Sequence, residues 1–261
     1  MQPVFDGGRP IDWGLTADDY AAFRPGPPDD FYDKLAVFKI CLSGQRILDL
    51  GTGTGVLARN FARRGAIAAG IDIAEESVEV ARKLAGTVGL HVDFRIAPAE
   101  EPPFPDHSFD VATANQCFQY FDPAKIYPAL RRVVTKQGAL MISHFNWLPC
   151  EDVIAAKTEE LILQYNPAWQ GGGFDGAVKI MPRGLPSDLR LESYFSYTVD
   201  VPFDHQSWRG RIRASRGVGA ALDRETVTRF DTELAAMLHR NCASEFTVKH
   251  LIDARVLRFT P

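Results

Sequence analysis

Short apolar runs in the first half of the chain alternate with segments whose apolar positions repeat at helical spacing. Runs of four to eight apolar residues predict buried strands, whereas repeats at three and four residues predict amphipathic helices. This alternation predicts parallel βαβ units in an open α/β sheet that is Rossmann-like and doubly wound. The expected strands are 46–50, 66–73, 91–97, 109–114 and 139–145, and the helices between them are 56–64, 75–85 and 122–134.

The two flanks of this alternating part have a different pattern. We expect a helix over 29–42 before it, and after Trp147 the alternation stops. Since no repeat, low-complexity tract or linker occurs, we expect one domain over 1–261, with an N-terminal helical cap at about 12–42 and an inserted helical and loop lid at about 147–190. The expected C-terminal elements are a helix at 151–165, a glycine-rich loop at 166–176, a strand at 191–201, helices from about 206 and over 223–240, and one or two strands over 246–259.

Composition and charge exclude several classes of partner. The chain is 46% hydrophobic and 24% charged, with a net charge of −4, so we expect no attraction to nucleic acid or to an anionic membrane. It has no uncharged apolar run of about 18 residues. The four cysteines are scattered without a CxxC pair, and no Asp/His cluster stands out. We therefore expect reduced thiols, a cytoplasmic location and no metal.

The segment ILDLGTGTGVLA places Gly51, Gly53 and Gly55 between an expected strand and an expected helix. Such glycines let the backbone approach a ligand closely. A phosphate-binding P-loop would need a lysine that is absent, and a dinucleotide G-x-G-x-x-G motif would need glycine where Val56 stands. A third ligand, S-adenosylmethionine, has no pyrophosphate to anchor. The alternative is a tight turn that binds nothing.

Asp72 ends the next expected strand, 21 residues after Gly51. A carboxylate at this point can accept hydrogen bonds from both ribose hydroxyls. NAD and S-adenosylmethionine both carry a ribose, so Asp72 indicates a nucleoside without choosing between them. It could instead cap the following helix.

Four motifs together resemble class I S-adenosylmethionine-dependent methyltransferases. LDLGTGTG, GIDI, AEEPPFPDHSFD and RRVVTKQGAL follow one another over about 45–145 in the order typical of that family, and the PFPDxSFD pattern resembles its small-molecule branch. YAAFRP at 20–25 and WRGRIRAS at 208–215 resemble a subgroup of trans-aconitate methyltransferase-like proteins. The resemblance implies a seven-stranded, mostly parallel sheet with an antiparallel C-terminal edge strand, and S-adenosylmethionine as cofactor.

The resemblance also implies cofactor-binding positions. Pro98 stands where many relatives carry a side chain that accepts a hydrogen bond from adenine, so adenine recognition would depend on backbone, on Glu100 or on water. The implied contacts are Tyr20 and Arg24 at the amino-acid end, Asp49, Gly51, Thr52 and Gly53 around the methionine moiety, Asp72 at the ribose, Ile73 and Ala99 at adenine, and Asn115 and Gln116 behind the methionine end.

Three side chains are candidates for positioning the acceptor: Gln119 and Tyr120, which by resemblance face the methyl group, and His144 at the end of an expected strand. His144 could be a base or only a packed histidine. Arg209, Arg213 and Arg216 share one face of an expected helix and would either bind an anionic acceptor or face solvent. The catalytic group itself is not identified.

Methyl transfer from a sulfonium needs alignment and exclusion of water, and it needs a base only when the nucleophile is protonated. Because no base is evident, the sequence favours a small organic acceptor that is methylated on a carboxylate oxygen. Two alternatives remain: a non-catalytic protein that binds S-adenosylmethionine or S-adenosylhomocysteine, and, less favoured by the glycine spacing, an NAD(P)-dependent oxidoreductase.

Overall fold

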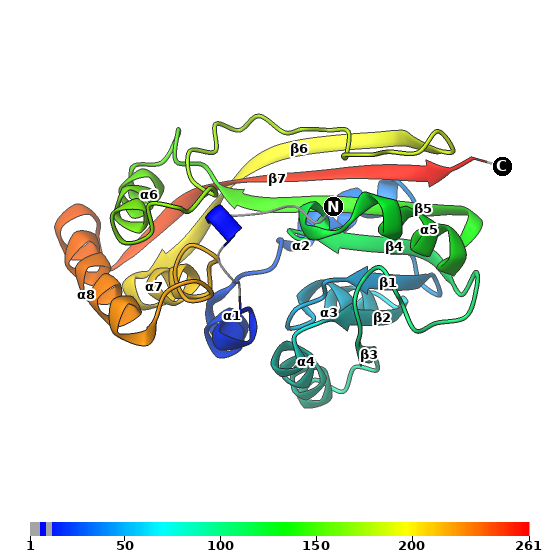
Figure 1. Cartoon of the computed structure of the whole chain (residues 1–261), viewed down its shortest axis with the longest axis horizontal. Helices are drawn as coiled ribbons and strands as arrows, with labels where there is room; N and C mark the ends of the chain where they lie inside the picture. Colours follow the sequence, from blue (N-terminus) through cyan, green and yellow to red (C-terminus); the bar gives the residue numbers. More distant parts are fainter. Residues whose placement is uncertain (1–5, 9–11, 261) are drawn as a thin grey trace.

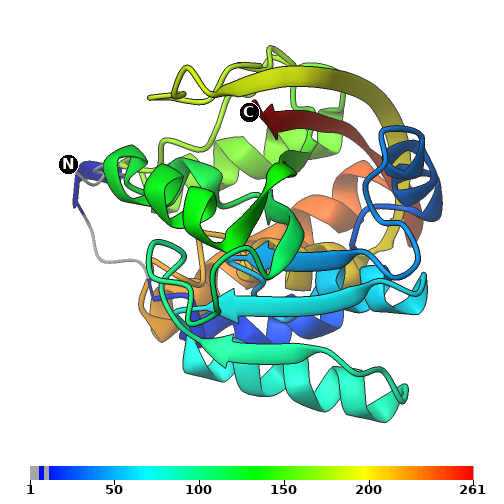
Figure 2. The same ribbon diagram turned by 90° about the vertical axis from the view of Figure 1, so that its right-hand side faces the viewer.

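The computed structural model describes residues 6–8 and 12–260, and its centre is one seven-stranded sheet (Figures 1 and 2). The strand order is β3-β2-β1-β4-β5-β7-β6. Strands β1 to β5 pair in parallel, and β7 is antiparallel to both β5 and β6. The predicted mostly parallel α/β sheet is confirmed, although β6 and not the C-terminal strand forms the edge. The strands are β1 (Arg46–Leu50), β2 (Ile67–Asp72), β3 (Asp93–Ile96), β4 (Phe109–Asn115), β5 (Val134–Trp147), β6 (Leu189–Asp204) and β7 (Glu245–Phe259).

Helices cover both faces of the sheet, because consecutive residues of the buried strands point to opposite sides. In β1, Ile47 joins a core cluster with α2 (Asp29–Val37) and α3 (Val56–Arg63). Its neighbour Leu48 joins a second cluster with α5 (Pro123–Val133). A smaller cluster holds α4 (Glu75–Thr87) against α3 and β3. This is the doubly wound arrangement that the alternating pattern predicts.

The C-terminal helices gather beside one end of the sheet together with α1 (Figure 1). Trp208 of α7 is fully buried there, and its indole donates a 3.0 Å hydrogen bond to Thr158 of α6. None of the helices described is long and apolar enough to cross a membrane. The elements of this region are α1 (Ala17–Phe23), α6 (Val153–Tyr165), α7 (His205–Arg213) and α8 (Arg224–Asn241). Three short 3-10 helices complete the list of helices: η1 (Asp6–Gly8), η2 (Gly14–Thr16), which directly precedes α1, and η3 (Phe118–Tyr120).

Several element boundaries differ from the predicted ones, and the one or two strands expected over 246–259 form one strand. The helix expected to reach residue 42 ends at Val37, because Lys39 and Cys41 take positive φ angles while Ile40 is buried in the core. Strand β5 begins directly after α5, where Val134 already pairs with Phe109 across a bulge.

Candidate active site

A cavity of about 430 Å³ opens at the carboxyl ends of β1, β2, β4 and β5. This is the edge where open α/β sheets bind ligands, and the volume is typical of small-molecule sites. Residues of α1, α6, α7 and the loop at 169–174 also line it. Ten residues predicted from the sequence line it: Tyr20, Arg24, Gly51, Gly53, Asp72, Ile73, Asn115, Gln116, Gln119 and Tyr120.

The glycine loop and Asp72 form one hydrogen-bonded unit. Gly51 has a φ of +57°, and a β-carbon there would lie 2.9 Å from the Cys117 sulfur. Gly53 donates its N–H to Asp72 Oδ2 at 2.8 Å, and Ala74 donates to Oδ1 at 3.0 Å. These bonds hold the Asp72 carboxylate at the wall of the cavity, where a carboxylate can accept further hydrogen bonds from ligand hydroxyls. Asp72 thus fits a pair of vicinal ribose hydroxyls.

The nearby apolar and cationic groups suit the two ends of a nucleoside amino acid. Ile73 is 67% exposed although it is apolar, and it lines the cavity directly after Asp72. The Tyr20 ring lies 3.8 Å from the β-carbon position of Gly53, and the Arg24 guanidinium lies 4.5 Å from the centre of that ring. Arg24 is therefore held near the glycine loop, where it can pair with a carboxylate.

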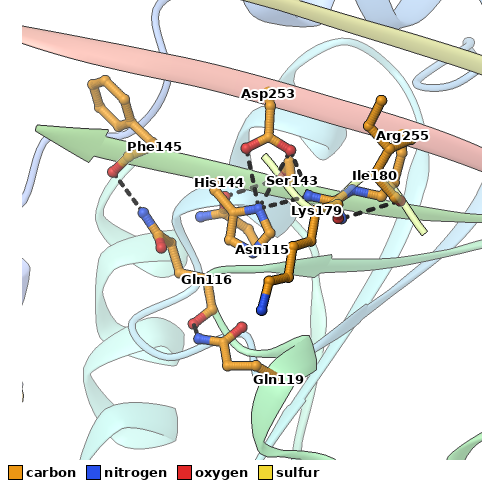
Figure 3. Close-up of polar contacts among 10 residues, drawn as sticks. All are labelled: Asn115, Gln116, Gln119, Ser143, His144, Phe145, Lys179, Ile180, Asp253 and Arg255. Atoms are coloured by element: carbon orange, nitrogen blue, oxygen red, sulfur yellow. Dashed lines mark hydrogen bonds and ion pairs between the residues drawn. The ribbon is translucent and has the colours of Figure 1, made fainter. Parts of the chain in front are cut away.

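The side-chain amides of Gln116 and Gln119, which follow β4, donate hydrogen bonds to backbone carbonyls (Figure 3). Gln116 has a φ of +65°, unusual for a residue other than glycine, and its backbone N–H donates to the Ser143 carbonyl at 3.0 Å. Its side-chain amide donates to the Phe145 carbonyl, and the Gln119 amide donates to the Gln116 carbonyl at 2.9 Å. These side chains are fixed in place, and neither can take up a proton at neutral pH.

Six predicted residues do not line the cavity. Asp49 is 3% exposed and accepts hydrogen bonds from Thr52 at 2.6 Å and Thr113 at 2.7 Å. Burial raises the pKa of Asp49 to about 6. Asp49 therefore stabilises the glycine loop from within the core, through its hydrogen bond with Thr52. The structure leaves Asp49, Thr52, Pro98, Ala99, Glu100 and His144 outside the lining; Ala99 is buried in the core, and Glu100 accepts from the Asp122 N–H at 3.0 Å.

His144 belongs to a buried ionic group on β5 and β7 (Figure 3). Its Nδ1 lies 3.1 Å from Asp253, which is 1% exposed. Arg255 donates to Asp253 at 2.7 Å and also to the carbonyls of Lys179 and Ile180. The group thus fastens the segment after the glycine-rich loop to the sheet.

Two of the three arginines expected on one helical face pair with aspartates and do not line the cavity. Arg209 pairs with Asp231, and Arg213 pairs with Asp19 and Asp231, both at 2.8 Å. Arg216 does line the cavity, where it contacts the Tyr120 hydroxyl at 3.2 Å and Asp6 at 3.0 Å.

The sequence reasoning missed Arg211 and Glu159, which both line the cavity and are each 5% exposed. The Arg211 guanidinium lies 4.8 Å from the centre of the Trp147 ring. Glu159 accepts from the Trp147 indole and from the Gly173 N–H, each at 2.6 Å. The apolar residues Trp208 and Ile212 define the buried face of α7, and helical spacing places Arg211 next to that face. The sequence pattern alone therefore could have indicated that Arg211 is buried.

No three His, Cys, Asp or Glu side chains are arranged to hold a metal ion within residues 6–8 and 12–260. The four cysteines are free thiols. Burial raises the pKa of the Cys117 thiol well above its usual range, and the thiol donates to the Leu50 carbonyl at 3.1 Å. Both effects favour the neutral form of the Cys117 thiol, which is a weaker nucleophile than a thiolate.

Comparisons with known proteins agree with this geometry. Residues 48–142 match the methyltransferase domain family. The chain is 36% identical to the ubiquinone biosynthesis O-methyltransferase of Hahella chejuensis over 53% of this chain and 57% of that protein. It is 34% identical to the protein of the same name from Xanthomonas euvesicatoria, over 67% of this chain and 72% of that protein. The chain spans little more than half the length of the first of these relatives.

Two solved structures share the fold. A putative type II methyltransferase from Anaeromyxobacter dehalogenans has a TM-score of 0.62 at 20% identity, covering 92% of this chain and 99% of that one. A methyltransferase from Geobacter sulfurreducens in complex with S-adenosylhomocysteine has a TM-score of 0.52 at 18% identity, covering 94% and 98%. Sheet order, glycine loop and relatives together show that the chain belongs to the class I S-adenosylmethionine-dependent methyltransferases.

Proposed function

We propose that the protein transfers a methyl group from S-adenosylmethionine to a carboxylate oxygen of a small organic acceptor. The observation that carries the proposal is the composition of the cavity. One end is formed by Gly51, Asp72 and Ile73, which suit a nucleoside, and arginines line the same cavity. A cofactor and an anionic acceptor could therefore meet in one enclosed space.

The side chains have distinct roles in this proposal. Asp72 accepts hydrogen bonds from the ribose, Ile73 packs on adenine, and Arg24 pairs with the carboxylate of the methionine moiety. When bound, S-adenosylmethionine supplies a methyl group that is already activated by its sulfonium. Gln119 and Tyr120 orient the acceptor for in-line attack, and the aromatic walls exclude water.

A carboxylate acceptor explains why no strong base is needed. Carboxylates are ionised at neutral pH, so no proton has to be removed. Burial raises the pKa of Tyr120, although the positive charge of Arg216 opposes this shift, so Tyr120 stays protonated and serves as a hydrogen-bonding group. The arginines in the lining would compensate the charge of the acceptor.

Glu159 supports a second candidate function, O-methylation of a hydroxyl. Burial raises the pKa of Glu159, while the hydrogen bonds from Gly173 and Trp147 oppose this shift. A carboxylate with a raised pKa is a better general base. The two curated relatives described above are both named O-methyltransferases. In this reading Glu159 would take the proton of the acceptor.

We also propose that the chain forms a single domain and that the protein is cytoplasmic. Trp13 and Tyr20 of the expected N-terminal cap line the cavity together with Trp169 and Phe174 of the expected lid. This supports a single domain in which both segments help to enclose the acceptor. Four free thiols suit a reducing compartment such as the cytoplasm.

The test is an incubation of the purified protein with methyl-labelled S-adenosylmethionine and a metabolite extract. We expect label in a product that mild base hydrolyses, because a methyl ester is base-labile. Label in a base-stable ether would contradict the carboxylate proposal and favour the Glu159 alternative. Binding of the cofactor without transfer to any extract would indicate a non-catalytic binding protein.

A further inference from the structure

Arg211 is a buried cation without an acidic partner. Among residues 6–8 and 12–260, no carboxylate lies at ion-pair distance from its guanidinium and no hydrogen bond from it is found. Its neighbours differ, since Arg209 and Arg213 of the same helix both pair with aspartates. At 5% exposure Arg211 has lost most of its hydration, and an unpaired buried charge is costly.

The surroundings of Arg211 are built to hold it toward the cavity. Its guanidinium lies over the face of Trp147 at 4.8 Å, and Glu159 fixes that ring through the indole N–H at 2.6 Å. Trp147 packs edge-on against Trp208, with 5.7 Å between ring centres. Burial lowers the pKa of Arg211 well below its usual range, and the positive charge of Arg24 acts in the same direction. An anion in the cavity would relieve both effects.

Two anionic groups could bind next to Arg211: the carboxylate of the methionine moiety or a group on the acceptor. Arg24 lies near the glycine loop, because it stacks on Tyr20, whose ring lies 3.8 Å from the position that a β-carbon of Gly53 would take. Arg211 instead lies on Trp147 at the end of β5, and Glu159 contacts the indole N–H of the same ring and the Gly173 N–H of the loop at 169–174. The cofactor carboxylate therefore suits Arg24 and leaves Arg211 for the acceptor.

We infer that Arg211, supported by Trp147, is the residue that recognises an anionic group of the acceptor. This inference rests on the proposed function and adds the residue that selects the acceptor. A planar guanidinium matches a carboxylate through two parallel hydrogen bonds. Glu159 is a positioning residue here, because it acts on Arg211 through Trp147. Neutral analogues of the acceptor, such as an amide, would leave Arg211 buried and unpaired.

The first experiment separates cofactor from acceptor by calorimetry. S-adenosylhomocysteine and 5′-methylthioadenosine, which lacks the amino-acid portion, are titrated into wild type, R211M and R24M. We expect R24M to weaken S-adenosylhomocysteine about tenfold or more without affecting 5′-methylthioadenosine. R211M should leave both affinities within about twofold of wild type. Selective weakening of S-adenosylhomocysteine by R211M would place the cofactor carboxylate on Arg211 and overturn the inference.

The second experiment addresses the acceptor with labelled S-adenosylmethionine and a metabolite extract divided on an anion exchanger at neutral pH. Label should enter products of the retained, anionic fraction. R211M should lower the initial rate about tenfold to a hundredfold in dilute extract, with partial recovery in concentrated extract, whereas R211K keeps part of the activity. R209M is the matched control on the same helix and should keep the wild-type rate.

The outcomes that overturn the inference differ from those that overturn the function. Product from the neutral fraction alone, or an R211M rate equal to wild type, would refute the role of Arg211 while methyl transfer stands. Absence of product from every fraction would refute the proposed function and, with it, the acceptor role. The thermal midpoint of ligand-free R211M should equal or exceed that of wild type, because a buried unpaired charge is removed. A clear decrease would indicate a structural arginine instead.

Discussion

Replacing Asp49 by Asn should make the protein relatively more stable as the pH rises. Burial raises the pKa of Asp49 from 3.8 to about 6, so the folded state holds the proton more tightly than the unfolded state. When folding raises the pKa of an acid, ionisation of that acid destabilises the folded state. This destabilisation reaches its full size at pH values above the pKa of the folded state. A rise of the pKa from 3.8 to about 6 corresponds to a cost of about 3 kcal/mol at pH 8 and roughly half of that at pH 5.

Asn is a suitable replacement because it can keep both contacts of Asp49. Its oxygen can accept from one of Thr52 and Thr113, and its amide can donate to the hydroxyl of the other. The free energy of unfolding of wild type and D49N is measured by urea titration from pH 5 to pH 8. The difference in the free energy of unfolding between D49N and wild type should shift by roughly 1 kcal/mol in favour of D49N over this range.

Asp110→Asn is the control for this series. Hydrogen bonds from Arg46 lower the pKa of Asp110 in the folded protein. The Asp110 carboxyl is therefore ionised in both the folded and the unfolded state from pH 5 to pH 8. The difference in the free energy of unfolding between D110N and wild type should not change over this range. A D49N difference that is also constant over this range, or that shifts against D49N, would refute the assignment of a buried, protonatable Asp49 beneath the glycine loop.

Three further substitutions test the site. G51A should lower the thermal midpoint by several degrees more than G44A, because both positions have positive φ but only the β-carbon at Gly51 would meet Cys117; equal decreases would contradict the close packing. D72N should weaken S-adenosylhomocysteine about tenfold to a hundredfold in calorimetry, through loss of charge-assisted hydrogen bonds to the ribose; unchanged affinity would remove Asp72 from the site. E159Q should lower the methyl-transfer rate less than about tenfold if the acceptor is a carboxylate, whereas a loss of about a hundredfold or more would identify Glu159 as a general base.

The parts predicted correctly depend on local patterns. The runs around Ile47 and Val111 are apolar because the strands are buried on both faces, so the alternation with helices revealed the parallel sheet. The glycines at 51 and 53 and the carboxylate of Asp72 occupy positions that backbone geometry dictates, and they line the cavity as expected. Such features require no knowledge of distant contacts.

The features that the sequence left open depend on tertiary contacts. Spacing put Arg209 and Arg213 on one helical face, but it could not reveal that Asp19 and Asp231 lie opposite them. Glu159 lies 12 residues from Trp147, and only the packing of α6 beside β5 brings the two side chains together. His144 looked available at a strand end until β7 placed Asp253 beside it.

The central claim is that the cavity beside Gly51 and Asp72 binds the nucleoside of S-adenosylmethionine. The most direct measurement is a calorimetric titration of the purified protein with S-adenosylhomocysteine and, separately, with NAD. We predict saturable binding of S-adenosylhomocysteine at one site per chain and no binding of NAD. Saturable binding of NAD without binding of S-adenosylhomocysteine would contradict the account.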